Sequence, residues 1–327
     1  MRNSKAFPRF IQWLVPLMAA CWSAAAGAGN VHALNADSSV VGVLTNLTSR
    51  HEDTLVDIGR SYSLGYEELR RANPGVDPWL PGEGTKVVLP TAFVLPRAEQ
   101  QGLVVNIAEY RVYFYYQLDG QPFVATVPAS IGRMDWATPL GRTRIVARVE
   151  QPSWYPPQSV REEYAADGRD LPPVVPPGPD NPLGDYALRL ALPGYLIHGT
   201  NRPAGVGMRV THGCIRLFPE DIAWLFPRTA LDMPVQIINQ PVKFGWSGDD
   251  LYLEVHPPLE SAATDASGAM TVLAEEFVRA TRERAAEVDW ELIDRVFREQ
   301  RGIPVRVGQA AVAGQKKATV ETVAFSD

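Results

Sequence analysis

Cysteine is scarce in this sequence: Cys21 and Cys214 are the only two in 327 residues. Cys21 lies in an N-terminal segment with the features of a removable signal, so a mature chain would keep Cys214 alone. One cysteine has no intramolecular partner, and this excludes a fold held together by disulfides. Cys214 needs another explanation, and the sharpest hypothesis is a nucleophilic thiol whose pKa is lowered by its surroundings.

Basic residues are in the minority, since 31 Lys and Arg stand against 37 Asp and Glu and give a formal net charge of −6. Removal of residues 1–33 would take away three positive charges and no negative ones. This balance argues against a nucleic acid partner, which favours a basic surface. With 46% hydrophobic residues the chain can bury ordinary cores, and its length allows about two domains.

The N-terminal apolar stretch, Phe10 to Trp22, follows three basic residues and is short for a membrane span. Small residues then offer cleavage sites after Ala28 and after Ala33. We therefore predict a signal peptide over residues 1–33 and export of the chain. An uncleaved anchor and a lipid on Cys21 are the alternatives.

Residues 41–90 have the pattern of a small unit with two short helices between two strands. The expected elements are strands Val40–Leu44 and Lys86–Leu89 and helices Thr54–Tyr62 and Tyr66–Ala72. Asp53 is expected to cap the first of these helices.

The same stretch, residues 41–90, resembles a LysM module, a peptidoglycan-binding βααβ fold. The resemblance lies in Asp53-Thr54-Leu55, Ile58, Leu64-Gly65, Glu68-Leu69, Ala72-Asn73-Pro74-Gly75 and Val88-Leu89-Pro90. Glu52 stands where family members usually carry glycine, which indicates an altered sugar-binding groove. The alternative is a helical spacer that binds no ligand.

After a linker over residues 91–101 the sequence changes to the period-two pattern of β-strands. The expected strands are Leu103–Ile107, Arg111–Tyr116, Phe123–Ile131, Arg142–Val149, Tyr186–Leu192, Tyr195–His198, Val235–Ile238, Lys243–Trp246 and Tyr252–Val255. One clear helix, Pro219–Phe226, interrupts them. Short strands divided by Gly and Pro turns favour a mainly β domain, a sandwich or barrel, over residues 101–240.

Three further segments complete the chain. Residues 151–184 form a long proline-rich insertion, and a loop of that length is typical of a lid or a substrate wall. Residues 241–307 are expected to form a strand and helical extension, with helical spacing over 271–300 and Asp289 as a cap. Residues 308–327 are expected to be a disordered tail.

The residues around Cys214 match the needs of an acyl-transfer site, which are a nucleophile, an oriented base and donors for an oxyanion. His198 ends a predicted strand, and the sixteen positions to Cys214 allow a loop that returns to the same sheet edge. Gly213 permits a tight turn whose amides form an oxyanion hole. Thr211 and the Gly199 carbonyl are candidate partners that orient an imidazole.

His198-Gly199-Thr200 and Thr211-His212-Gly213-Cys214-Ile215-Arg216-Leu217 resemble the active-site signature of L,D-transpeptidases of the YkuD type. The flanking segments Ile131-Gly132-Arg133, Thr138-Pro139-Leu140-Gly141 and Gly178-Pro179-Asp180-Asn181-Pro182-Leu183-Gly184 agree with it. The order of signal, LysM module and catalytic domain is similar to that of periplasmic ErfK/YbiS/YcfS/YnhG-like members. The resemblance therefore implies a mainly β, YkuD-like fold and a periplasmic location.

It also implies a reaction. Cys214 would attack the carbonyl of meso-diaminopimelate in a peptidoglycan tetrapeptide stem, release D-alanine and form a thioester. An amine, from a second diaminopimelate in a 3→3 crosslink or from the C-terminal lysine of an outer-membrane lipoprotein, would then take the acyl group. His198 would carry the proton, the amides of Gly213 and Cys214 would hold the oxyanion with support from His212, and Arg216 would bind a substrate carboxylate. No cofactor or metal is implied.

Alternatives stay open. His198, His212 and Cys214 could supply three zinc ligands, although the motif holds no acidic residue to serve as a general base. A hydrolase on the same scaffold would let water take the thioester, and a non-catalytic wall-binding protein would leave the thiol inert. A buried structural cysteine, a core histidine and an ion-paired Arg216 are the corresponding structural interpretations.

Overall fold

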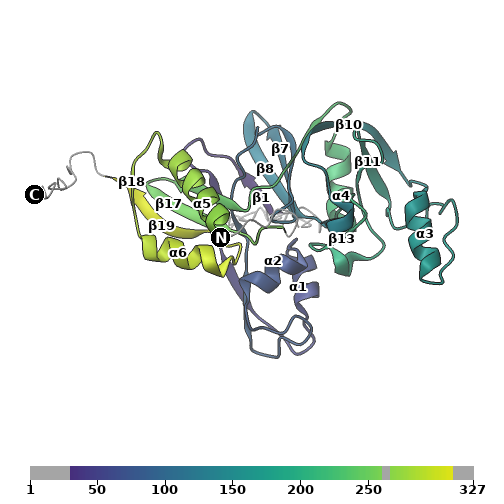
Figure 1. The fold of residues 1–327 in the computed structure, drawn as a ribbon, viewed down its shortest axis with the longest axis horizontal. Coiled ribbons are helices and arrows are strands. Elements are labelled where there is room, and N and C mark those ends of the chain that lie inside the picture. Colours follow the sequence, from purple (N-terminus) through teal and green to yellow (C-terminus); the bar gives the residue numbers. More distant parts are fainter. Residues whose placement is uncertain (1–29, 260–265, 312–327) are drawn as a thin grey trace, which may run out of the picture.

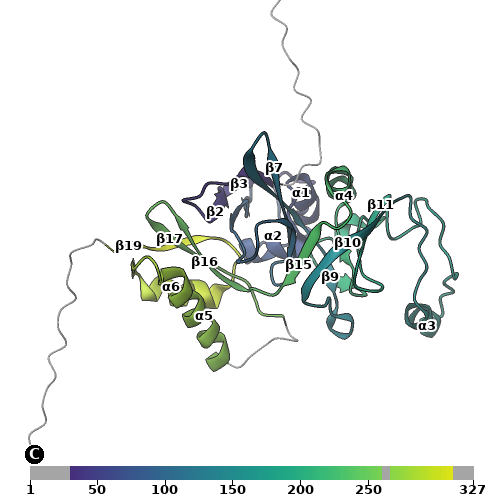
Figure 2. The same cartoon turned by 90° about the horizontal axis from the view of Figure 1, so that it is seen from above.

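The computed structural model describes residues 30–259 and 266–311. These residues form an elongated molecule with a large sheet at its centre, a pair of short helices beneath the sheet and a second sheet covered by helices at one end (Figures 1 and 2). Within the described part of the chain, no helix combines the length and apolar character needed to cross a membrane. The predicted mainly β architecture with C-terminal helices is confirmed.

The large sheet has nine strands in the order β1-β8-β7-β6-β15-β10-β11-β12-β14. Their bounds are β1 Asn30–Ala33, β6 Gly102–Asn106, β7 Arg111–Leu118, β8 Gln121–Pro128, β10 Gly141–Glu150, β11 Tyr186–Leu190, β12 Leu196–His198, β14 Ile215–Arg216 and β15 Pro234–Ile238. Two neighbouring pairs, β15–β6 and β12–β14, are parallel, and the others are antiparallel. A short parallel pair, β9 Ile131–Gly132 with β13 Arg209–Thr211, lies beside it.

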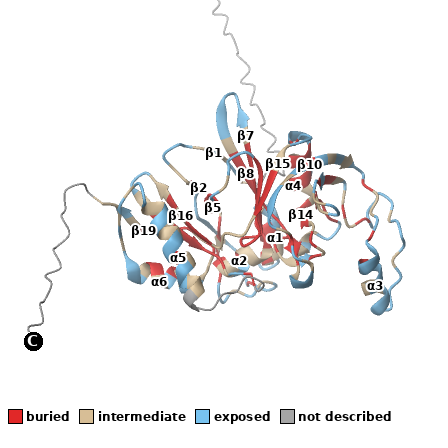
Figure 3. Ribbon diagram, turned by 45° about the horizontal axis from the view of Figure 1, so that its top comes forward, coloured by how far each residue is buried: buried red, intermediate tan, exposed pale blue. Residues whose placement is uncertain are grey.

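Both faces of the central strands are buried, as the red strands in Figure 3 show. Alternate side chains of a strand point to opposite faces. Accordingly, Leu103 and Val105 of β6 enter a core that includes helix α4, Pro219–Leu225. Val104, between them, enters a second core shared with the two short helices. This double burial explains why the central strands have long apolar runs rather than a strict alternation.

The second core is covered by the βααβ unit, which we define as residues 45–89. It contains β3 Thr45–Thr48, α1 Leu55–Ser61, α2 Tyr66–Ala72 and β4 Lys86–Leu89, and β3 pairs antiparallel with β4. The bounds of α2 and β4 are those predicted. Thr54 caps α1, because its hydroxyl oxygen accepts a hydrogen bond from the backbone amide of Asp57 at 3.1 Å. The prediction of Asp53 as the cap is therefore wrong.

The predicted first strand of this unit, Val40–Leu44, is also wrong. Residues 40–42 form β2, Val40–Gly42, which pairs with β5, Ala92–Val94. All three residues of β5 are buried, so this part of the segment predicted as a linker belongs to the core, whereas residues 99–101 are exposed. The two prolines that flank it, Pro90 and Pro96, end the strand without preventing it.

The βααβ unit is fixed to the large sheet by charged and backbone contacts. Arg111 of β7 is fully buried and donates from Nε and Nη2 to the two carboxylate oxygens of Glu68, each at 2.9 Å. The backbone amides of Tyr66 and Glu67, at the start of α2, donate to the carbonyls of Val206 and Gly207 at 3.2 and 3.3 Å. These two carbonyls belong to the loop that joins His198 to Cys214.

The C-terminal part forms a separate layer with its own core. Its sheet has the order β16-β17-β19-β18, with β16 Val242–Ser247, β17 Asp250–Val255, β18 Ala286–Val288 and β19 Val305–Ala310. Helices α5 Ala266–Thr281 and α6 Trp290–Glu299 lie on this sheet, and Asp289 caps α6 as predicted. Because β19 reaches Ala310, the predicted tail cannot begin at residue 308; residues 312–327 lie outside the described part.

Residues 30–33 were predicted as the end of the signal peptide, but they form β1 at the edge of the large sheet, paired with β8. Cleavage after Ala33 would remove this strand, whereas cleavage after Ala28 would leave it in place. The rest of the predicted signal, with Cys21, lies outside the described residues.

Candidate active site

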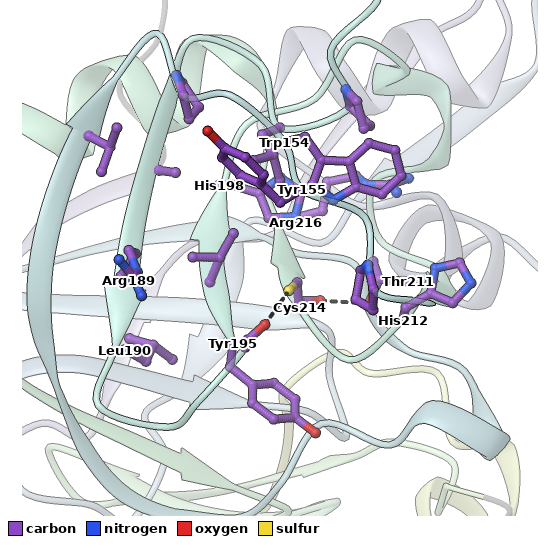
Figure 4. Close-up of a pocket in the computed structure, with 18 of the residues that line it drawn as sticks. Trp154, Tyr155, Arg189, Leu190, Tyr195, His198, Thr211, His212, Cys214 and Arg216 are labelled. Atoms are coloured by element: carbon purple, nitrogen blue, oxygen red, sulfur yellow. Dashed lines mark hydrogen bonds between the residues drawn. The ribbon is translucent and has the colours of Figure 1, made fainter. Parts of the chain in front are cut away.

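The predicted motif residues meet where β12 and β14 lie side by side. These two strands are parallel, and His198 is the register partner of Arg216. Cys214 directly precedes β14, so the loop from Gly199 to Gly213 returns the thiol to the strand that ends in His198. Figure 4 shows these side chains around one pocket.

The turn that carries Cys214 is held by two threonine hydroxyls. Thr211 Oγ1 donates to the carbonyl of Cys214 at 2.6 Å, and Thr138 Oγ1 donates to the carbonyl of Gly213 at 2.8 Å. Gly213 has a φ of +99°, and a Cβ there would lie 2.8 Å from Cε1 of Tyr195, so only glycine fits. The expectation that Thr211 orients an imidazole is wrong, since its hydroxyl holds the backbone of the nucleophile instead.

His198 is buried and neutral. Its Nδ1 lies 2.6 Å from the carbonyl of Gly199, the contact expected of that residue. A carbonyl only accepts, so Nδ1 carries the proton of the neutral ring, and a further backbone hydrogen bond with Leu183 also acts on the imidazole. Burial, together with the positive charge of Arg216, lowers the pKa of His198 to about 3. The imidazole is therefore uncharged at neutral pH.

Cys214 is half-buried, and its Sγ donates to the carbonyl of Gly194 at 3.6 Å. Burial raises the pKa of this thiol, against the smaller opposing effects of a backbone hydrogen bond from Leu196 and of Arg216. The prediction of a lowered thiol pKa is therefore wrong for this arrangement. With its pKa raised, the thiol is protonated at neutral pH and needs a base to become a nucleophile, and His198 lines the same pocket.

Arg216 has spare hydrogen-bonding capacity. Its Nε is buried and has no hydrogen-bond partner among the described residues. Burial and the neighbouring Arg202 lower the pKa of the Arg216 guanidinium from its ordinary value. A cation that lacks a carboxylate partner inside a pocket is suited to an anionic ligand.

The pocket has a volume of about 720 Å³. The insertion over residues 151–184 lines it through Trp154, Tyr155 and Val160, among others, as a substrate wall would. Buried Asn181 closes the base of the insertion, because its Nδ2 donates to the carbonyl of Pro152 at 2.7 Å. Arg189 and Arg216 also line the pocket, and none of the described residues that line it carries a carboxylate. The pocket is thus cationic in a chain with a net negative charge.

Glu163 is the residue of this site that the sequence did not reveal. It lies on α3, Gln158–Ala166, within the insertion, and accepts a hydrogen bond from His212 Nε2 at 2.9 Å. Its two oxygens also accept from Nη1 and Nη2 of Arg133 at 2.8 and 2.6 Å. Arg133 and then His212 lower the pKa of Glu163 to about 2. No local pattern marks Glu163, because its partner His212 is 49 positions away.

The zinc alternative needs the ligand atoms of His198, His212 and Cys214 to converge. Instead, the His212 ring binds Glu163. Within the described ranges, the group of possible ligand atoms that converges to within 4.8 Å is Glu109, Glu254 and His256, far from the motif in the sequence. Lys243 already lies between these two carboxylates.

Comparison with known proteins identifies the family. The profile of the YkuD family, the L,D-transpeptidase catalytic domain, matches residues 100–237. The probable L,D-transpeptidase YcfS of Escherichia coli (strain K12) is 38% identical over 267 residues, which are 80% of this chain and 82% of the relative. The probable L,D-transpeptidase ErfK/SrfK of Salmonella typhimurium is 39% identical over 249 residues, 75% of this chain and 80% of the relative.

Among solved structures, an L,D-transpeptidase from Mycobacterium smegmatis covers 47% of this chain and 63% of its own, at 22% identity and a TM-score of 0.33. That score is low, and the assignment rests on the curated relatives, which match over most of their length. The chain belongs to the L,D-transpeptidase family.

Proposed function

We propose that this L,D-transpeptidase uses Cys214 to transfer the acyl group of a peptidoglycan tetrapeptide stem to an amine. The observation that carries the proposal is one cationic pocket that contains the Cys214 thiol, the neutral base His198 and Arg216, whose Nε has no partner in the described chain. A stem peptide carries several carboxylates, and the two arginines of the pocket suit such a ligand. Arg216 is assigned to a substrate carboxylate.

The geometry supports a specific order of proton movements. His198 Nε2 takes the thiol proton as sulfur attacks the carbonyl of meso-diaminopimelate, and the negative charge on the former carbonyl oxygen is held by the amides of Gly213 and Cys214. Collapse of this intermediate breaks the bond to D-alanine, whose amine takes the proton from His198. The product is a thioester on Cys214.

The second half repeats the chemistry in reverse. An acceptor amine attacks the thioester, His198 takes its proton, and the thiolate leaves and is reprotonated. Diaminopimelate as the acceptor gives a 3→3 crosslink, and the terminal lysine of an outer-membrane lipoprotein gives an attached lipoprotein. Water would give a trimmed stem instead. No metal or organic cofactor is needed for any of these steps.

The test compares the protein with a Cys214→Ala variant. Each is incubated with purified disaccharide-tetrapeptide, and the products are analysed by mass spectrometry. We expect loss of D-alanine and 3→3 dimers with the unaltered protein, and a fall of roughly a thousandfold or more in the variant. Tripeptide without dimers would identify a hydrolase, or a lipoprotein acceptor if a lysine-ended peptide restores transfer. D-alanine release by the variant would refute Cys214 as the nucleophile.

We further propose that the βααβ unit is a LysM module that binds wall glycan, and that the protein is exported to the periplasm after cleavage behind Ala28. The order of two helices between paired strands supports the first proposal. The pairing of β1 with β8 supports the cleavage position. Two measurements test them: sedimentation with purified peptidoglycan, which should persist in Cys214→Ala, and the N-terminal residue of the exported protein, which should be Gly29.

A further inference from the structure

We propose that Glu163, on the insertion, is a positioning residue that holds the oxyanion-binding turn of the site by fixing His212. The inference deepens the proposed acyl transfer and rests on it. Glu163 touches neither the thiol nor His198 in the hydrogen bonds described above, so it acts through another residue.

Both residues that hydrogen-bond the Glu163 side chain, His212 and Arg133, are connected to the turn that carries Cys214. His212 directly precedes Gly213, and its ring binds the carboxylate at 2.9 Å. The other partner, Arg133, donates its backbone amide to the carbonyl of Thr211 at 3.0 Å, so it is bound to the turn by a second route. Trp136 meets the His212 ring edge-on, with 5.2 Å between the ring centroids. The imidazole is therefore held by a carboxylate and by an aromatic ring.

The turn needs such support because its central residue is glycine. A glycine at φ +99° has no side chain to restrict it and can adopt many other conformations. The threonine hydroxyls hold the carbonyls of Gly213 and Cys214, but an oxyanion hole also needs amides that point in one direction. A fixed His212 side chain restricts the peptide unit that it shares with Gly213. We infer that this peptide unit loses its fixed direction when Glu163 no longer binds the ring.

The carboxylate of Glu163 is negatively charged at neutral pH. Its pKa of about 2 keeps it ionised above about pH 4, with Arg133 as the larger cause. Its side chain is one-third exposed, so replacement with a neutral isostere does not bury a new polar group. We therefore expect Glu163→Gln to weaken the hydrogen bond to His212 without a large effect on the stability of the fold.

The experiment separates two reactions of the same thiol. Under the proposed function, we expect a carbapenem to acylate Cys214 through an oxyanion, whereas iodoacetamide alkylates the sulfur without one. Both rates are followed by intact mass for the purified protein, Glu163→Gln and the control Glu162→Gln, which alters the neighbouring carboxylate of α3 whose partner is Gln158. We expect acylation to slow about tenfold in Glu163→Gln only, with alkylation within about twofold of the unaltered protein. With tetrapeptide, kcat should fall while KM stays within about twofold.

Each other outcome overturns the inference. Equal acylation in the two variants would show that Glu163 does not support the turn. Equal slowing of acylation and alkylation would show an effect on the thiol or on access to it. A fall in Tm larger than about 5 °C relative to Glu162→Gln would make Glu163 a structural residue. Failure of the unaltered protein to be acylated, while iodoacetamide still reacts, would refute the proposed function itself.

Discussion

Two clusters of polar side chains in this molecule differ in how completely they are paired. The buried ion cluster, Glu109, Lys243, Glu254 and His256, joins the large sheet to the C-terminal layer. Lys243 Nζ lies 2.7 Å from Glu109 Oε2 and 2.8 Å from Glu254 Oε1, and it donates to the Val94 carbonyl at 2.7 Å. His256 Nε2 binds Glu254 at 2.6 Å. Each charge thus has a partner of opposite charge.

The catalytic pocket shows the opposite condition. Its base is uncharged, its thiol donates to the Gly194 carbonyl over a long 3.6 Å, and Arg216 Nε has no partner in the described chain. Buried polar groups are normally satisfied, and exceptions require an explanation. The difference indicates that the converging side chains of Glu109, Glu254 and His256 serve the stability of the fold, because Lys243 already pairs with the carboxylates. The Arg216 Nε in the pocket, unpaired among the described residues, remains free to bind a ligand.

The largest expected effect comes from breaking the complete cluster. Lys243→Met would leave the carboxylates of Glu109 and Glu254 buried without a cation. We expect the free energy of unfolding to fall by about 3–5 kcal/mol. Denaturant unfolding measures this loss, with Lys86→Met, at an exposed lysine of β4, as the control. Equal stability of the two variants would contradict the structural role of the cluster.

Asp221 of α4 tests the comparison at a buried carboxyl to which no cation among the described residues is hydrogen-bonded. Burial raises its pKa to about 7, although Ser63 donates to both of its oxygens at 3.1 Å. The pKa of Asp221 in the folded protein exceeds its ordinary value of 3.8, so folding favours the protonated carboxyl. The contribution of this preference to the free energy of unfolding is fully present below about pH 4 and is lost as pH rises to 7. Asp221→Asn should remove this loss, which amounts to about 4 kcal/mol at most.

Denaturant unfolding between pH 4 and 8 measures that difference. The Asn variant should gain stability relative to the unaltered protein as pH rises, and the two profiles should run parallel above pH 7. Glu162→Gln, at an exposed carboxylate of α3 whose partner is Gln158, is the control and should not show this gain. Parallel profiles of Asp221→Asn and the unaltered protein over the whole range would refute the buried neutral carboxyl.

The smallest expected effect is at the incomplete site. Arg216→Gln should lower kcat/KM for tetrapeptide about 10–100-fold, mainly through KM, because a hydrogen bond to a charged group is lost. Its stability should not fall, since the Nε it removes has no partner. Steady-state kinetics with Arg161→Gln, an exposed arginine of α3, as the control would check this. A stability loss with unchanged kcat/KM would make Arg216 a structural residue.

The sequence predicted seven of the nine strands of the large sheet, because their apolar residues mark buried positions, but it placed β1 in the signal peptide and did not predict the two-residue strand β14. It failed at β3, where Thr45-Asn46-Leu47-Thr48 is largely polar and exposed and so lacks a hydrophobic pattern. It also failed at β5, which is three residues long and lies among prolines, features typical of a linker. Burial of β5 comes from distant contacts, including the amide of Val94 with Glu254 at 2.6 Å.

The motif residues of the site were predictable because they are local in sequence. His198, Cys214 and the Gly213 turn lie within one short stretch, and their meeting follows from two parallel strands. Glu163 was not predictable, since a helix within a proline-rich insertion brings it to His212. The raised pKa of Cys214 was also missed, because burial depends on the whole fold and not on the neighbouring sequence.

The contact between α2 and the loop that leads to Cys214 has a geometric consequence. Because the amides of Tyr66 and Glu67 bind the carbonyls of Val206 and Gly207, the βααβ unit is attached directly to the loop that leads to the thiol. A glycan strand bound by this unit would present its side branches to the pocket at one spacing. Stems at that spacing from the bound stretch would then be modified in preference to others, whereas a hinged module would remove this preference.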